Sequence, residues 1–271
     1  MFNFTLTQYF VALLVTGIIN GSLGLFVILK GFNKRLNQVL ALYSLSLFLW
    51  SIFEALAITR YNESLALLLW RINHIGVIFI PVFLTHFTFI FLDIKGRKRK
   101  LIPISYAVAC IFLILDATPL LILEVVPKFS FRYFINPGRL YYIFFWMWIG
   151  WAVYGNVELF REYFRTSGYK RNQMQYFFWS LLFSYIGGVP NFFPTFNIEI
   201  PILMPFGTYA IPLYALATAY AILRYRFMDI KIAFTRVGIF VIVYTVVLGI
   251  PLGLTGWGKY WLQGLFGAGW Y

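Results

Sequence analysis

Four ionisable residues lie within otherwise apolar stretches of the sequence: Glu54, Arg71, His74 and Asp116. A charged side chain inside a bilayer is costly, so each is a functional candidate unless it only satisfies a polar group on a neighbouring helix. The helical rise of about 1.5 Å per residue places Glu54, His74 and Asp116 at similar depth, in the outer part of a membrane. We therefore predict a polar pocket that binds a small ligand or exchanges a proton, with simple pairing between helices as the alternative.

The expected partners of these residues follow from the direction of helical side chains. Arg71 is expected at the outer interface, either as an anchor or in a buried ion pair. Helical side chains lean toward the N-terminus of their helix, so Arg71 leans outward and Glu54 leans inward. His74 is on the same face as Arg71 but deeper, and is therefore the better partner for Glu54. Three tryptophans are candidate aromatic walls of this pocket, or residues of the interface belt: Trp146, Trp148 and Trp151.

The sequence does not indicate other catalytic or metal chemistry. His86 lies about 120° around the helix from His74, so the two cannot hold one ligand from a single helix, and His86 is expected to pack against a neighbouring helix. There is no His-x-x-x-His pair, nucleophile elbow or phosphate loop. Cys110 is the single cysteine, which argues against a disulfide framework or a cysteine metal cluster. We expect no metal, no cofactor and no enzymatic activity in this chain.

The composition predicts an integral membrane protein. Of the 271 residues, 61% are hydrophobic and 11% are charged, against about 25% charged residues in soluble domains. We predict an all-α, polytopic membrane helical bundle of about eight transmembrane helices. A seven-helix core would occupy residues 1–231, and an additional helix with the start of an outer hairpin would occupy 232–271. The apolar spans, each long enough to cross a bilayer, lie at about 8–29, 38–58, 68–92, 101–122, 140–157, 175–194, 203–223 and 236–255.

The charges predict the orientation of the chain. Most of the 22 Lys and Arg residues fall in every second loop, near Lys34, Lys98, Arg165 and Arg226. The positive-inside rule puts these loops in the cytoplasm and the N-terminus outside. The lipid bilayer then accounts for the net charge of +13, and nucleic acid is not needed as a partner. The longest outer loop, at about 124–138, is too short to form a separate domain.

Three stretches resemble a known family: AYAILRYRFMDIKIAFTR from Ala219, LLLWRINHIGVIFIPVFLTHFTFIF from Leu67 and RLNQVLALYSLSLFLWSIFEAL from Arg35. They are similar to the N-terminal seven-transmembrane sensor module of bacterial histidine kinases and related signalling proteins, and the resemblance covers nearly the whole chain. It implies a multi-pass sensory module in the bacterial inner membrane that passes a ligand or membrane signal to a cytoplasmic kinase or other output domain. A homodimer is a further candidate assembly. The chain stops after the eighth span, so we expect a fragment of a longer protein or a separate output partner.

The segment after the seventh span is a candidate signal-transmitting linker. It carries Arg224, Arg226, Asp229 and Lys231, and its basic side chains can rest on anionic headgroups. A tilt or rotation of the seventh span would shift it, although an ordinary loop that sets topology would have the same composition. A small-molecule transporter or permease is the alternative function, but the inverted repeats common in transporters are not evident.

Overall fold

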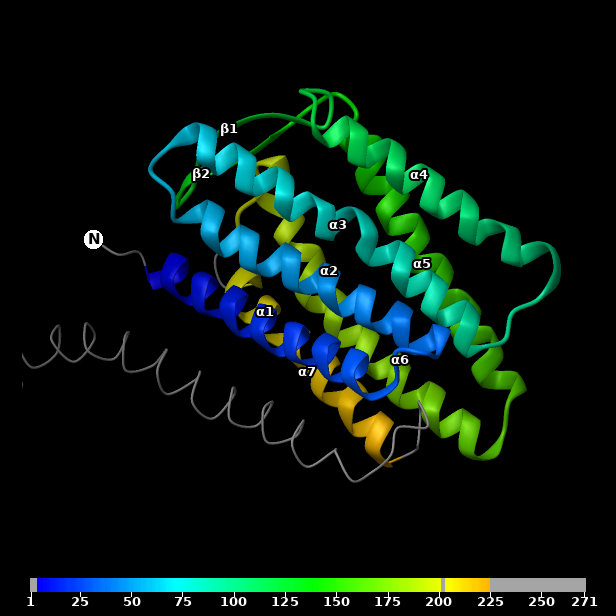
Figure 1. Cartoon of the computed structure of the whole chain (residues 1–271). Coiled ribbons are helices and arrows are strands. Elements are labelled where there is room, and N and C mark those ends of the chain that lie inside the picture. The colour runs from blue at the N-terminus through cyan, green and yellow to red at the C-terminus, as the bar shows by residue number, and fades with distance from the viewer. Residues whose placement is uncertain (1–3, 201–202, 225–271) are drawn as a thin grey trace, which may run out of the picture.

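The computed structural model describes residues 4–200 and 203–224. This part of the chain is a bundle of α-helices with one β-hairpin at an end (Figure 1). The predicted eighth helix and the predicted boundary between residues 231 and 232 lie outside the described residues. The elements, in chain order, are α1 (Phe4–Gly31), α2 (Arg35–Ile58), α3 (Glu63–Phe91), the 3-10 helix η1 (Gly96–Lys100), α4 (Leu101–Asp116), β1 (Ile122–Lys128), β2 (Phe131–Pro137), α5 (Tyr141–Arg165), α6 (Gly168–Gly188), the 3-10 helix η2 (Val189–Phe196) and α7 (Leu203–Arg224).

The seven α-helices of the described part correspond to the first seven predicted spans. By length and apolar composition, three of these described helices, α1, α2 and α3, are each able to cross a membrane. The predicted limits differ most at the sixth span, which was expected at 175–194. There α6 ends at Gly188 and the chain continues as η2, which contains Pro190 and Pro194. Proline lacks the N–H that an α-helix needs, which accounts for the change of helix type.

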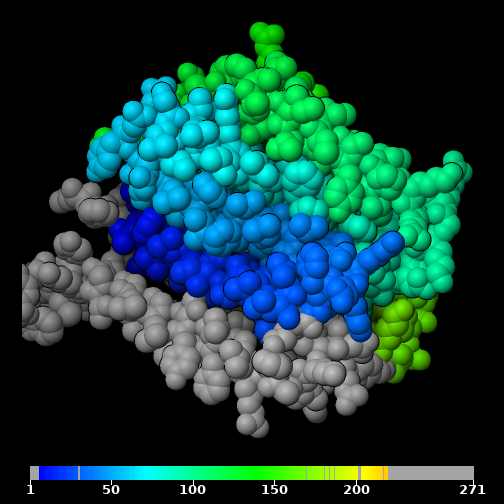
Figure 2. Space-filling view, in the orientation of Figure 1, coloured from blue at the N-terminus to red at the C-terminus, as the bar shows by residue number. Residues whose placement is uncertain are grey.

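Six of the helices form a closed ring. α1 packs against α2 and α7, α3 packs against α2 and α5, and α6 packs against α5 and α7. α4 lies outside this ring and packs against α3, as Figure 1 shows. Figure 2 shows one face of the molecule as successive bands of side chains from α1, α2, α3 and α4. The centre of the ring is therefore enclosed by helices that are far apart in the sequence.

A glycine sets the close approach of α2 and α3. A Cβ atom added at Gly76 of α3 would lie 2.6 Å from the backbone nitrogen of Trp50 and would also clash with the carbonyl oxygen of Ser46, both in α2. Small residues at helix contacts allow such close packing in membranes. The start of α3 is fixed by Asn62, whose side chain accepts a hydrogen bond from the Leu65 N–H at 2.8 Å, as is typical of a helix N-cap.

The predicted outer loop at about 124–138 folds into an antiparallel β-hairpin that the sequence pattern did not predict. Val125 of β1 lies opposite Ile135 of β2, and both side chains are buried. The hairpin contacts α2, α3 and η2. The Lys128 ammonium donates hydrogen bonds to the carbonyl oxygens of Pro194 at 3.3 Å and Thr195 at 3.0 Å, and burial lowers the pKa of Lys128 from its usual 10.5. The hairpin therefore covers one end of the bundle and is fixed to η2.

Candidate functional site

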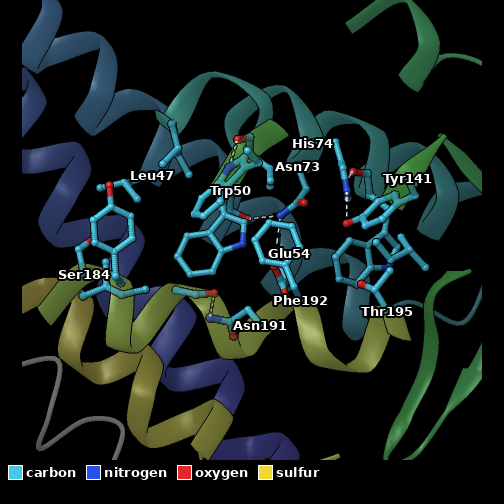
Figure 3. Close-up of a pocket in the computed structure, with 18 of the residues that line it drawn as sticks. Leu47, Trp50, Glu54, Asn73, His74, Tyr141, Ser184, Asn191, Phe192 and Thr195 are labelled. Carbon is cyan, nitrogen blue, oxygen red and sulfur yellow. Dashed lines mark hydrogen bonds between the residues drawn. The ribbon is translucent and has the colours of Figure 1, made fainter. Parts of the chain in front are cut away.

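A cavity with a mostly apolar wall and several polar side chains lies inside the helix ring (Figure 3), and the hairpin contributes Phe134 and Ile135 to its wall. Its walls come from α2, α3, α5, α6, α7, η2 and β2, and include Glu54, Asn73, His74, Trp148 and Asn191. The cavity leaves about 50 Å³ for the centres of water-sized spheres. A water molecule needs roughly 10–15 Å³ on this measure, so the space suits a few waters or a small polar group.

Glu54 is the buried carboxyl group of this cavity, with 2% of its surface exposed. Its Oε1 accepts a hydrogen bond from the Tyr9 hydroxyl of α1, and its Oε2 accepts one from Asn73 Nδ2 of α3 at 3.4 Å. Asn73 Nδ2 also donates to the carbonyl oxygen of Trp50. Among the described residues, no salt bridge reaches Glu54. The carboxyl group is therefore held by uncharged partners.

A chain of hydrogen bonds, which we call the polar relay, connects Glu54 through Tyr9 and Asn191 to Thr208. The Tyr9 hydroxyl is 2.7 Å from Asn191 Oδ1, and the Thr208 hydroxyl is 3.2 Å from the same oxygen. The Asn191 amide is oriented by its Nδ2, which donates to the carbonyl oxygen of Gly187 at 2.8 Å. The polar relay thus joins α2, α1, η2 and α7 through one set of side chains.

His74 lines the same cavity but bonds to other groups. Its Nδ1 is 3.0 Å from the Trp70 carbonyl oxygen and its Nε2 is 3.2 Å from the Tyr141 hydroxyl. A carbonyl can only accept, so Nδ1 carries a proton, and in the neutral ring Nε2 accepts from Tyr141. The structure therefore brings Glu54 and His74 to one cavity without the direct hydrogen bond between them that was expected.

Arg71 and Asp116 both lie outside the cavity. Asp116 ends α4 with 4% of its surface exposed, and its charge interacts with that of Arg71 on α3. Within the described residues, Arg71 Nε and Asp116 Oδ1 have no hydrogen-bond partner. Neither residue lines the cavity. Of the four residues that were predicted to form one pocket, only Glu54 and His74 therefore line this cavity.

The three candidate tryptophans of α5 also separate. Trp148 lines the cavity and its Nε1 donates to the Val77 carbonyl oxygen at 2.9 Å. Trp146 is 68% exposed, and neither it nor Trp151 lines the cavity. His86 bonds through Nδ1 to the Tyr106 hydroxyl of α4 at 2.8 Å, so the prediction of a histidine packed against a neighbouring helix is confirmed.

Sequence reasoning missed most of the uncharged members of the site. Tyr9, Asn73, Asn191 and Thr208 are all buried, but none carries a charge at neutral pH, and only their position within apolar spans could have singled them out. Of the predicted linker, Arg224 is the last residue of α7, whereas Arg226, Asp229 and Lys231 lie outside the described residues. In the part of the chain that the structure describes, no three His, Cys, Asp or Glu side chains gather where they could hold a metal ion.

A ring of apolar helices around a cavity with buried polar side chains is typical of a polytopic membrane protein whose polar groups face its interior. A family model described as the N-terminal 7TM region of histidine kinase matches residues 12–231. The chain belongs to this family, and both the resemblance and the membrane helical bundle predicted from the sequence are confirmed. It is a membrane sensory input module of the histidine kinase type, a region without catalytic function. No curated protein and no solved structure matches the chain.

Proposed function

We propose that this input module senses a small polar ligand or a proton at Glu54 and passes the change through the polar relay to α7. The observation that carries the proposal is the connection of a buried carboxyl group, which has no cationic partner among the described residues, to α7 by the hydrogen bonds of Tyr9, Asn191 and Thr208. Ionisable groups buried in membrane helices most often serve ligand recognition or proton transfer.

The hydrogen bonds of the polar relay can take two arrangements, which differ in the group that accepts the Tyr9 hydrogen bond. The Tyr9 hydroxyl has one proton, so it can donate to Glu54 or to Asn191 but not to both at once. When Glu54 is ionised, it accepts the hydrogen bond of the Tyr9 hydroxyl, and Asn191 Oδ1 then accepts from Thr208 alone. When Glu54 is protonated, or when the donor group of a ligand satisfies it, Tyr9 is free to donate to Asn191.

Thr208 can follow this change because its hydroxyl has two acceptors within reach. It lies 2.8 Å from the Met204 carbonyl oxygen in its own helix and 3.2 Å from Asn191 Oδ1 in η2. Asn191 Oδ1 has two lone pairs and can accept from both hydroxyls, but a second donor on the same oxygen weakens the first bond, so a Tyr9 hydrogen bond to Asn191 shifts the Thr208 hydroxyl toward the bond within α7. The state of Glu54 therefore alters how firmly α7 is held to η2, and a ligand shifts the balance between two arrangements.

We further propose that α7 passes the signal to a cytoplasmic output domain through the linker of Arg224, Arg226, Asp229 and Lys231. The helix ends that carry Lys34, Lys98 and Arg165 lie at the same end of the bundle as Arg224, away from the hairpin (Figure 1). The positive-inside rule makes that end cytoplasmic, so the hairpin and the N-terminus would face outward in a bacterial inner membrane. The output domain would belong to the same chain or to a partner, as part of a dimer.

Autophosphorylation in a fusion of the chain to a histidine kinase core, reconstituted in nanodiscs, tests the proposal. Glu54→Gln keeps the shape but cannot ionise, so output should become insensitive to external pH and remain near one limit. Asp116→Asn is the matched control, because it removes a second buried carboxylate that does not line the cavity. A normal response in Glu54→Gln would contradict the proposal, as would substrate flux through proteoliposomes, which favours a transporter.

A further inference from the structure

A long apolar groove runs between α5 and α6 and shares part of its wall with the inner cavity. Its volume is about 540 Å³. α5 and α6 pack less extensively against each other than α6 and α7 do, which leaves this space open. The walls are almost entirely apolar and include Val153, Phe160, Phe178 and Leu182. In a chain that spans a membrane, such a groove faces lipid.

The length of the groove matches one leaflet of a bilayer. On α5 its lining extends from Trp148 to Arg161, which at 1.5 Å per residue is roughly 20 Å. Half of a hydrocarbon core of about 30 Å is about 15 Å. A single extended acyl chain can therefore lie in the groove with its headgroup near Arg161.

The headgroup end of the groove carries an excess of positive charge. Arg161 lines the groove, and its Nη1 donates to Glu158 Oε1 at 3.1 Å. The same carboxylate also accepts from Lys98 Nζ at 2.7 Å, so two cations share one negative charge. Arg165 adds a further positive charge one turn along α5 and Glu162 a negative one, so three cations face two carboxylates and one positive charge remains in excess. Basic pockets between transmembrane helices at the cytoplasmic face are suited to anionic lipid headgroups.

We propose that the groove between α5 and α6 is a binding site for one anionic phospholipid, with an acyl chain along the apolar walls and the phosphate at Arg161. The proposal depends on the membrane location of the chain and not on sensing at Glu54. Trp148 and Tyr185 line both the groove and the inner cavity. The bound lipid would thus contact two side chains that also form the wall of the proposed sensing site.

The test uses the full chain in phosphatidylcholine nanodiscs that contain a phosphatidylglycerol probe with a photoreactive diazirine on its acyl chain. After irradiation, peptide mass spectrometry should place the label mainly on residues 149–160 and 178–189. Unlabelled phosphatidylglycerol should compete about fivefold better than phosphatidylcholine, since one basic side chain contributes about 1 kcal/mol at an anionic surface.

Two pairs of variants separate the parts of the site. Arg161→Gln should remove the headgroup preference, while Lys95→Gln, which loses an ion pair to Asp93 and does not line the groove, should retain it. Val153→Trp should fill the groove and abolish labelling there, while Ile111→Trp on the exposed face of α4 should not. Labelling spread evenly over the lipid-facing helices would overturn the proposal. So would equal competition by the two lipids, or unchanged labelling in Val153→Trp.

Discussion

Replacing Gly76 by Ala should push α2 and α3 apart. The added Cβ would stand 2.6 Å from the Trp50 nitrogen and 3.2 Å from Leu49 Cβ, and its shortest contact is with the Ser46 carbonyl oxygen. Two of these three atoms belong to backbone, which cannot rotate away as a side chain can. Because non-bonded heavy atoms prefer about 3.5–4.0 Å, the helices must separate by roughly 1 Å. Overpacking of this kind lowers the free energy of unfolding by about 1–3 kcal/mol.

The assay for this change is unfolding in mixed micelles, followed by circular dichroism. Gly150→Ala is the matched control, because no atom lies within 4 Å of a Cβ atom added at Gly150. Its stability should be unchanged or raised by up to about 1 kcal/mol, through the better helix propensity of alanine. Equal stability of the two variants would refute the close α2–α3 contact that positions Trp50 and Glu54.

Three further changes test other contacts. Tyr9→Phe should lower the free energy of unfolding by about 0.6 kcal/mol, and at most by about 1.7, the range for hydrogen bonds between membrane helices. It should also weaken the response of the kinase fusion, while the control Tyr106→Phe should leave that response intact. Burial lowers the pKa of Lys128, so between that pKa and 10.5 the unfolded chain binds more protons than the folded chain. The temperature at the unfolding midpoint should therefore rise with pH in this window, and Lys128→Met should remove the rise. Arg224→Gln with Arg226→Gln should change basal kinase output without changing insertion, and altered topology alone would reduce the linker to an orientation signal.

The helices of the bundle were predictable because a membrane imposes a length and an apolar composition on every span. Their ends were less so. α6 starts at Gly168 and its first turns hold Lys170, Arg171 and Asn172, which a search for apolar runs passes over. The predicted end of that span was wrong for a different reason. Hydropathy does not distinguish an α-helix from the 3-10 helix η2 that follows it.

The β-hairpin was missed because its pattern is irregular. A half-buried strand is recognised by strict alternation of apolar and polar residues. Here the register shifts between Ile122 and Glu124, and again between Val126 and Lys128. Each shift breaks the period of two, as bulges do, so the alternation never extends far enough to be recognised.

For the site, the sequence supplied only the depth of each residue along its helix and the direction of its side chain. It placed Glu54 and His74 at a similar level, and both line the cavity. It could not show which helices are neighbours, and the position of α4 outside the ring is what takes Asp116 away from Glu54. The polar relay could not be predicted for the same reason, because Tyr9 and Asn191 are 182 residues apart in the sequence.

A double-mutant cycle between the two ends of the polar relay tests most directly whether Glu54 communicates with α7. Glu54→Gln and Thr208→Val are combined in the kinase fusion, and output is expressed as the ratio of active to inactive kinase. Residues of one hydrogen-bond network typically couple by at least about 0.5 kcal/mol, so the double variant should depart from the product of the single effects by roughly twofold or more. The matched pair Glu54→Gln and Thr85→Val should be additive, because Thr85 donates to the Trp151 carbonyl oxygen away from the relay. Additivity of Glu54→Gln with Thr208→Val would contradict the relay.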